Sequence, residues 1–185
     1  MKTMKTSQFS NPRQKRIALF PGSFDPFTRG HESIVLRALP LFDEVVIAIG
    51  VNINKQSLTS MEQREAFIRS VFRNEPKVRV VSYTGLTADI ARECGAQFFL
   101  RGVRMIQDFE NEMHMAEVNR ELSGMETVLL YTLPEDSHIS SSIVRELIKY
   151  GRDVSDYLPR GLDMSLIPDN WIIKKLKRET TNNQK

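Results

Sequence analysis

The sequence is poor in the residues on which several classes of protein depend. It has one cysteine, Cys94, and its longest apolar runs, such as residues 45–49, are far shorter than a membrane span. A single cysteine excludes an intramolecular disulfide and a cysteine-rich metal cluster, so Cys94 is predicted to be a small buried residue. The first residues also lack the apolar core of a signal peptide, and we expect a cytoplasmic location.

Three catalytic signatures are absent from the sequence. It contains no GxxxxGK[ST] phosphate-binding loop, no HExxH zinc-protease motif and no GxSxG nucleophile elbow.

Its 185 residues, of which 41% are hydrophobic, suffice for one substantial core. We therefore expect a single domain over residues 16–173, between a flexible basic leader at 1–15 and a basic tail at 174–185.

Positive charge is concentrated at the two ends of the chain. The first 16 residues carry five basic side chains and no acidic one, the last twelve carry five basic and one acidic, and the remainder is net acidic. Basic ends on an acidic body are more typical of solvated tails than of a nucleic-acid surface. We therefore expect no nucleic-acid partner and no membrane partner.

Hydrophobic periodicity predicts strands that alternate with helices. Strands are expected at residues 17–20, 44–50, 77–82, 97–100 and 126–132, and helices from about 31, at 60–73, 87–93 and 108–122, and from about 139. This alternation predicts the α/β class, with a doubly wound parallel sheet of five strands. The loops at the carboxyl ends of the strands, where such sheets form a cleft, are 21–30, 50–59, 101–107 and 133–140.

The first of these loops is the most informative segment. It reads PGSFDPFTRGH over residues 21–31 and joins a short apolar strand to an amphipathic helix. Gly22 and Gly30 allow a tight turn and a close approach to a ligand, while Thr28 and His31 lie three residues apart at the helix start. An anion, and a phosphate above all, is favoured there over an ordinary helix-terminal histidine. Ser23 is either a turn hydroxyl or a ligand donor.

Two further loops carry candidate anion ligands. Arg101 and Arg104 follow the strand predicted at 97–100, where two guanidinium groups beside a glycine are as consistent with phosphate binding as with solvated arginines. The three serines at 140–142 exceed the one hydroxyl that a helix N-cap needs, so they can form a second anion site. Lys55 lies in a polar loop, where a lysine by itself predicts nothing.

The helix predicted at 108–122 places polar groups on an apolar face. Glu112 and Asn119 share that face with Phe109 and Met113 by spacings of three and four residues. An unpaired buried carboxylate costs on the order of several kcal/mol, so Glu112 is expected either to pair with an arginine or to meet a ligand. The methionines are expected in the core or at a subunit interface rather than on a metal: Met105, Met113, Met115 and Met125.

Taken together, these segments resemble the bacterial phosphopantetheine adenylyltransferase family. The resemblance covers about residues 16–160 and rests on TRGH at 28–31, RGVR at 101–104, DFENEM at 108–113, NR at 119–120 and ISSSIVRE at 139–146. It implies a Rossmann-like nucleotidylyltransferase fold and transfer of the adenylyl group of ATP to 4′-phosphopantetheine. The products would be dephospho-coenzyme A and pyrophosphate, with Mg²⁺ present. It also implies a homohexamer.

The resemblance assigns roles to individual residues. The catalytic residues it implies are His31, Lys55 and Arg101, and His31 would stabilise the α-phosphate in the transition state. The implied acceptor-binding residues are Ser23, Lys55, Thr87 and Arg101. The implied ATP-binding residues are Ser23, Phe24, His31, Gly102, Val103, Arg104, Glu112, Asp136, Ser137, His138, Ile139, Ser140, Ser141 and Ser142.

The chemistry of this reaction agrees with the absence of the usual nucleophile motifs. An acceptor phosphate is already a nucleophile at neutral pH, so in-line attack needs no covalent enzyme intermediate. Positive donors would be Lys55, Arg101, Arg104 and His31. The metal would be carried mainly by the phosphates, so no protein ligand is predicted for it.

Two positions differ from the family pattern, and two alternatives stay open. His138 stands where relatives commonly have an aromatic residue, and Thr87 stands where they often have an apolar one. The first alternative is another small-molecule nucleotidylyltransferase of the same superfamily, which would use CTP or act on nicotinamide mononucleotide or glycerol phosphate. The second is a noncatalytic nucleotide-binding protein.

Overall fold

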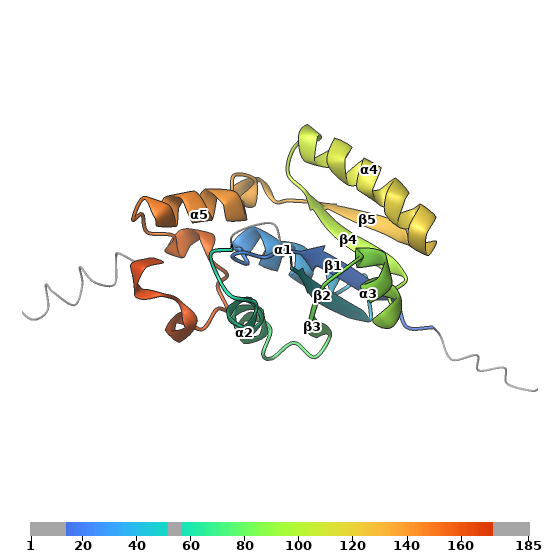
Figure 1. Cartoon of the computed structure of the whole chain (residues 1–185), viewed down its shortest axis with the longest axis horizontal. Coiled ribbons are helices and arrows are strands. Elements are labelled where there is room, and N and C mark those ends of the chain that lie inside the picture. Colours follow the sequence, from blue (N-terminus) through green and yellow to red (C-terminus); the bar gives the residue numbers. More distant parts are fainter. Residues whose placement is uncertain (1–13, 52–56, 172–185) are drawn as a thin grey trace, which may run out of the picture.

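The apolar segments form a five-stranded parallel sheet with helices on both faces (Figure 1). The computed structural model describes residues 14–51 and 57–171. Its strands are β1 (Ile17–Gly22), β2 (Glu44–Gly50), β3 (Val78–Tyr83), β4 (Phe98–Val103) and β5 (Glu126–Tyr131). The strand order is β3-β2-β1-β4-β5, and every neighbouring pair is parallel. The predicted doubly wound α/β class is confirmed.

Five α-helices connect or follow these strands. They are α1 (Arg29–Ala38), α2 (Met61–Val71), α3 (Thr87–Glu93), α4 (Ile106–Ser123) and α5 (Ser141–Lys149). Short 3₁₀ turns follow at Pro134–Asp136, Ser155–Tyr157, Met164–Leu166 and Asp169–Trp171. Within residues 14–51 and 57–171, no helix combines the length and apolarity needed to span a bilayer. The leader, apart from Gln14 and Lys15, and the tail lie outside the described residues, so the domain limits stay a prediction.

Most predicted boundaries agree with the structure, but β4 is longer than its apolar part. The sequence places the end of this strand before Arg101, whereas Arg101, Gly102 and Val103 belong to it. The reason is pairing with β5, because Arg101 lies opposite Leu129 and Val103 opposite Tyr131 in a continuous ladder. Hydrogen bonds to a neighbouring strand extend β4 beyond the point at which its hydrophobic pattern stops.

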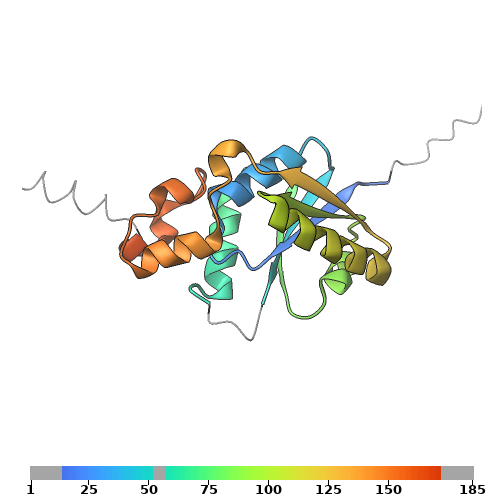
Figure 2. The same ribbon diagram turned by 90° about the horizontal axis from the view of Figure 1, so that it is seen from above.

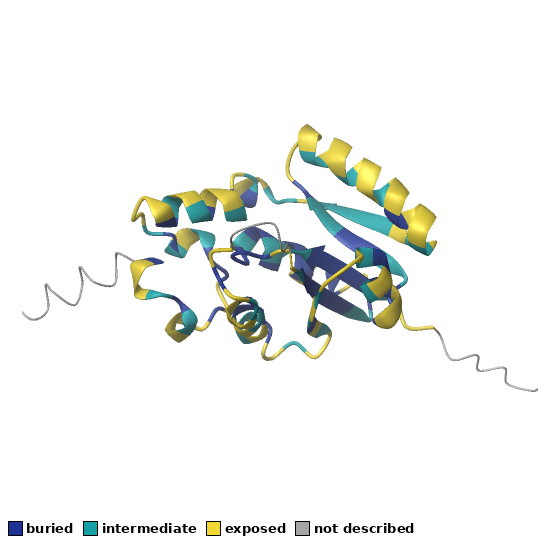
Figure 3. Cartoon of the chain, in the orientation of Figure 1, coloured by how far each residue is buried: buried dark blue, intermediate teal, exposed yellow. Residues whose placement is uncertain are grey.

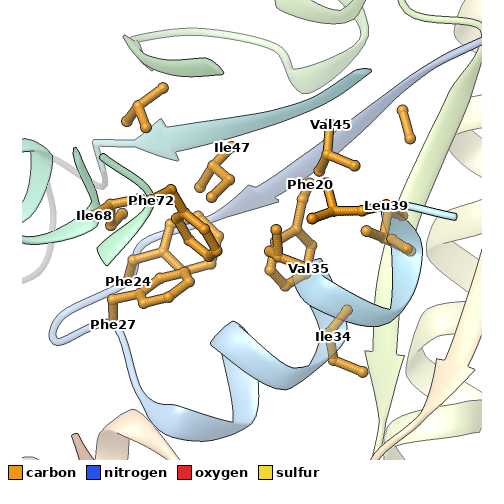
Figure 4. Close-up of a cluster of buried hydrophobic side chains, with 14 of the residues drawn as sticks. Phe20, Phe24, Phe27, Ile34, Val35, Leu39, Val45, Ile47, Ile68 and Phe72 are labelled. Carbon is orange, nitrogen blue, oxygen red and sulfur yellow. The ribbon is translucent and has the colours of Figure 1, made fainter. Parts of the chain in front are cut away.

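Alternate residues of each strand enter two separate parts of the core, as the period of a β-strand requires. Val45 and Ile47 face α1 and α2 in one hydrophobic cluster (Figure 4), whereas Val46 and Ala48 face α3 in another. Cys94 is buried in the second cluster, as predicted. A third cluster joins α2 and α5 to the segment that follows α5, and this part lies at one end of the sheet (Figures 1 and 2).

The centre of the sheet contains a topological switch point. From β1 the chain adds β2 and β3 on one side, and then crosses to place β4 on the other side of β1. The β1–β4 ladder consists of two pairs, Ala18 with Phe98 and Leu19 with Phe99. Beyond these pairs the carboxyl ends of β1 and β4 are no longer registered with each other. Open α/β sheets bind ligands at such a point.

Candidate active site

A cavity of about 380 Å³ opens where β1 and β4 separate. Its walls come from the end of β1, the loop and first turn of α1, the end of β4, the start of α4 and the start of α5. The four loops predicted to form a cleft follow β1, β2, β4 and β5. Those after β1, β4 and β5 contribute residues to the wall of this cavity. The sheet topology therefore brings together residues that are more than 100 positions apart in the sequence.

The turn after β1 is packed around one aromatic ring. Phe24 is buried and adopts a positive φ of 48°, which is uncommon for a residue other than glycine. Its ring lies 5.3 Å from that of Phe20, 5.3 Å from that of Phe27 and 5.2 Å from that of His31, between ring centroids. A Cβ at Gly22 would lie 2.7 Å from Cζ of Phe24, so only glycine fits beneath this ring.

A buried carboxylate connects this turn to the segment before α2. Asp25 accepts hydrogen bonds from the backbone N–H of Leu58 at 2.8 Å and from the N–H and hydroxyl of Thr59 at 2.9 and 2.6 Å. Arg64 lies 3.7 Å from the Asp25 carboxylate and donates to the carbonyl of Ser23 at 3.0 Å. Asp25 therefore fixes the loop that presents Ser23.

His31 is oriented by its own helix N-terminus. The backbone N–H of Thr28 donates to Nδ1 of His31 at 3.0 Å, so Nδ1 is an acceptor and the ring proton lies on Nε2. Burial, followed by the positive charges of Arg104 and Arg101, lowers the pKa of His31 from 6.5 to about 3. His31 is therefore neutral at pH 7. The expectation that it acts as a positive donor is wrong, because the ring is desolvated and faces two cations.

The two arginines of the RGVR segment are held by carboxylates of α4. Arg101 donates to both oxygens of Glu112 at 2.6 Å, and its remaining nitrogen, Nη1, donates to the carbonyl of Pro21 at 2.7 Å. Arg104 donates to both oxygens of Asp108 at 2.8 and 3.1 Å. These hydrogen bonds hold the pKa of Asp108 below its usual value, despite its partial burial. Glu112 thus pairs with an arginine and also lines the cavity.

The third wall is the start of α5. Ser140 is the N-cap, and its hydroxyl accepts from the backbone N–H of Ile143 at 3.2 Å. Ser141 donates to the carbonyl of Pro26 at 2.9 Å, which joins α5 to the turn after β1. Ser142 accepts from Arg145 at 3.0 Å, and both residues line the cavity.

Arg145 is a cavity residue that the sequence analysis missed as a candidate. Its guanidinium also donates to the carbonyl of Asp25 at 2.6 Å. A signal was present, because Arg145 follows Ser142 by three residues and a helix brings such positions to one face. Asp108 is a second missed cavity residue, although it lies within the DFENEM motif.

A second cavity of about 260 Å³ adjoins the first. Pro21, Gly22, Ser23 and Arg101 line both cavities, so the two meet at the ends of β1 and β4. The second cavity extends toward β3 and α3, and the remaining residues of its wall are Gly50, Val51, Tyr83, Gly85, Thr87, Met115 and Asn119. The site is therefore one continuous cleft with two compartments.

The structure brings most of the predicted site residues to this cleft. Residues of the first cavity are Ser23, Phe24, His31, Arg101, Gly102, Arg104, Glu112, Ile139, Ser140, Ser141 and Ser142, and Thr87 belongs to the second. Four predicted residues are not among the cavity linings, namely Val103, Asp136, Ser137 and His138. Lys55 lies outside the described residues.

Val103 and Asp136 have other environments. The side chain of Val103 is buried in the interior. Asp136 is buried and pairs with Arg29 of α1 at 2.7 Å, while Arg29 also donates to the carbonyls of Asp156 and Glu135. This ion pair ties the first turn of α1 to the loop before α5. The ring of His138 lies 6.1 Å from that of Tyr157.

Fold and site together define a nucleotidylyltransferase. The family model described as cytidylyltransferase-like matches residues 19–147, from within β1 to within α5. A bifunctional nicotinamide mononucleotide adenylyltransferase and ADP-ribose pyrophosphatase from Francisella tularensis has the same fold. Its TM-score is 0.60 at 17% identity, and the match covers 78% of this chain and 45% of that one.

Comparison with curated sequences narrows this class. A phosphopantetheine adenylyltransferase of Porphyromonas gingivalis is 55% identical over 148 residues, which are 80% of this chain and 97% of that one. That of Bacteroides thetaiotaomicron is 48% identical over 150 residues, which are 81% of this chain and 99% of that one. The chain belongs to the phosphopantetheine adenylyltransferase family.

The neutral state of His31 predicts a pH-dependent stability. Between pH 6.5 and about 3 the unfolded chain binds a proton at His31 that the folded chain does not, so stability falls as the pH falls through this window. The slope from this group is at most about 1.4 kcal/mol per pH unit. His31→Gln removes the titration but keeps the cap, since glutamine is a common third residue of a capping box. Urea denaturation of both proteins between pH 7.5 and 5 measures the difference.

We expect the stability of the variant relative to the native protein to rise as the pH falls below 6.5. Above pH 7 the difference between the two should be constant. A difference that stays constant down to pH 5 would show that His31 titrates normally in the folded protein.

Proposed function

We propose that this chain transfers the adenylyl group of ATP to 4′-phosphopantetheine, forming dephospho-coenzyme A and pyrophosphate in coenzyme A synthesis. Membership of the phosphopantetheine adenylyltransferase family supports this proposal. The observation that carries it is that Ser23 and Arg101 line both compartments of one cleft. A transferase that joins two anionic molecules needs such a shared wall.

In this proposal each compartment takes one substrate. ATP occupies the larger cavity, whose lining includes Phe24, Gly102, Arg104, Glu112 and residues 139–142. The arm of the acceptor occupies the smaller cavity beside Thr87, and its phosphate lies at Ser23 and Arg101, with Lys55 as a further cation. Arg145 and Ser142 are suited to the distal phosphates, because a guanidinium and a hydroxyl lie together at the start of α5.

The proposed chemistry is a single in-line displacement. An oxygen of the acceptor phosphate forms a bond to the α-phosphorus of ATP, and the bond from that phosphorus to the bridging oxygen breaks, so that pyrophosphate leaves. Holding the two phosphates in line supplies up to roughly 7–11 kcal/mol through proximity. His31 acts as a neutral donor through Nε2, which interacts more strongly as charge builds on the α-phosphate oxygens.

Magnesium enters this proposal as a companion of the nucleotide. Among the described residues, no group of three or more His, Cys, Asp or Glu side chains could hold a metal. The two carboxylates of the larger cavity, Asp108 and Glu112, are each engaged by an arginine. This donor set fits Mg²⁺ held by phosphate oxygens and water, the usual mode for nucleotide-bound magnesium, where it neutralises phosphate charge.

We further propose that the protein is a homohexamer, because α4 is largely uncovered in one chain (Figure 3). Ile106, Phe109 and Met113 form one apolar stripe, and Met115, Val118 and Leu122 form another on a different side of the helix. All six side chains are more than a third exposed, and exposed apolar surface of this extent marks an interface. Two separate stripes allow two kinds of subunit contact, which a dimer alone does not need.

The sequence alone supports the cytoplasmic location and the absence of nucleic-acid and membrane partners, and both remain predictions.

The four methionines that were expected in the core or at a subunit interface have different environments. Met105, Met113 and Met115 are exposed, while Met125 packs against the core.

Loss of the oligomer is the expected result of a charge on α4. Val118→Glu places a carboxylate on an apolar stripe, and burying it at a subunit contact costs several kcal/mol. Light scattering coupled to gel filtration should give about six times the 21.3 kDa chain mass for the native protein and a smaller species for the variant. Glu117→Gln, which removes a charge at an exposed position of the same helix, is the control and should keep the native mass. A native protein of one-chain mass would refute the hexamer.

Acceptor selectivity tests the proposed reaction directly. The full-length protein is incubated with ATP, Mg²⁺ and one of three acceptors, namely 4′-phosphopantetheine, nicotinamide mononucleotide or glycerol phosphate, and pyrophosphate is measured. Of the three acceptors, we expect only 4′-phosphopantetheine to give pyrophosphate release. Removal of the metal by EDTA should abolish this activity. Release with CTP in place of ATP, or with another acceptor alone, would point to a different member of the superfamily.

Replacement of His31 separates catalysis from nucleotide binding. His31→Gln keeps the cap on Thr28 but lacks the Nε2 donor at the α-phosphate. Loss of one such donor lowers kcat by about 10²–10³. ATP affinity, measured by calorimetry, should change only a few-fold because the donor acts mainly in the transition state. Equal losses in affinity and in rate would support a nucleotide-binding protein that does not catalyse.

A further inference from the structure

The two compartments of the cleft differ in charge. The described lining of the larger cavity includes three arginines and two carboxylates, whereas Arg101 is the one charged side chain in the described lining of the smaller cavity. Away from Arg101 the smaller cavity offers hydroxyl, amide and apolar groups. It is therefore suited to a ligand with an anionic end and a long neutral arm that forms hydrogen bonds.

Two hydroxyl groups face each other in this neutral part. The hydroxyl of Tyr83 lies 2.9 Å from Oγ1 of Thr87, and both residues line the cavity. Tyr83 ends β3 and Thr87 begins α3, so the hydrogen bond spans the loop between these elements. The family resemblance implies an acceptor-binding role for Thr87, and it implies none for Tyr83.

The position of the Tyr83 ring is built into the sheet. Gly50 of β2 lies opposite Tyr83 in the ladder, and a Cβ at Gly50 would lie 3.1 Å from the Tyr83 hydroxyl oxygen and 3.2 Å from Cζ. The ring therefore lies across the space that a side chain at position 50 would occupy. This packing fixes where the phenol hydroxyl can reach.

The chemistry of the two hydroxyl groups favours one direction for this hydrogen bond. A phenol hydroxyl is a stronger hydrogen-bond donor and a weaker acceptor than an aliphatic hydroxyl. Tyr83 therefore donates to Thr87, which leaves the hydroxyl proton of Thr87 free to point into the cavity. In that state Thr87 is a hydrogen-bond donor, matched to a carbonyl acceptor on the ligand.

We propose that Tyr83 is a positioning residue that fixes the hydroxyl of Thr87 as a donor to an amide carbonyl in the neutral arm of the acceptor. The proposal rests on the proposed function, since it takes the acceptor arm to lie in the smaller cavity. An arm without a carbonyl at that point leaves Thr87 unpaired, and a loss of affinity follows.

Single hydroxyl deletions test this role. Tyr83→Phe keeps the ring over Gly50 and removes only the hydroxyl, while Thr87→Val removes the proposed donor with little change in volume. We expect either change to raise the KM for 4′-phosphopantetheine about three- to tenfold, the range for one neutral hydrogen bond. The KM for ATP and kcat should stay near their native values, because the pair lies outside the larger cavity.

Three comparisons make the test specific to the pair. The KM of the double variant for 4′-phosphopantetheine should be no higher than that of the more impaired single variant, since both deletions remove the same interaction. Thr87→Ser keeps the hydroxyl and should restore most of the acceptor affinity. Tyr150→Phe, on a side chain that is 68% exposed and outside both cavities, is the matched control and should behave as the native protein.

The outcomes are distinguishable from failure of the proposed function. If the native protein does not turn over 4′-phosphopantetheine, the proposed function fails first. If the native protein is active and Tyr83→Phe leaves the acceptor KM unchanged, the positioning role is overturned. A parallel loss of kcat, ATP affinity and melting temperature in Tyr83→Phe would overturn it as well, because the hydroxyl would then be structural.

Discussion

The structure of the site depends on the separation of two strands. β1 and β4 are neighbours in the sheet but share two ladder pairs, Ala18 with Phe98 and Leu19 with Phe99. Pro21 has no N–H with which to continue the ladder. Arg101 of β4 donates instead to the Pro21 carbonyl at 2.7 Å, so a side chain crosses the gap. Both cavities open at this point, and every proposed role depends on it.

Two of the three arginines in the described lining of the larger cavity are paired with carboxylates. Arg101 and Arg104 are paired with Glu112 and Asp108, and His31 is neutral. A set of unpaired cations would repel one another and would raise the cost of folding the cleft. Carboxylates on α4 relieve this repulsion and hold the guanidinium groups in fixed places. An incoming phosphate then competes for arginines that are already oriented.

The helix α4 shows why a pattern can be read in more than one way. Its sheet-facing side includes Glu112 and the buried Asn119, while Phe109 and Met113, placed on the same face by spacing, are exposed by 39% and 42%. An apolar residue on such a helix can serve the core of its own chain or a contact with another subunit. Periodicity reports that a face is apolar, but it does not say which neighbour covers it.

The sequence by itself determined the alternation of strands and helices, the turn around His31 and the serine-rich start of α5, because these features follow from local periodicity, capping and glycine placement. Tertiary structure alone decided the length of β4, the pairing of both arginines, the neutral state of His31 and the roles open to Asp25, Tyr83 and Arg145. These properties depend on contacts between segments far apart in the chain. Burial and charge pairing act through space, and one sequence read in order does not contain those distances.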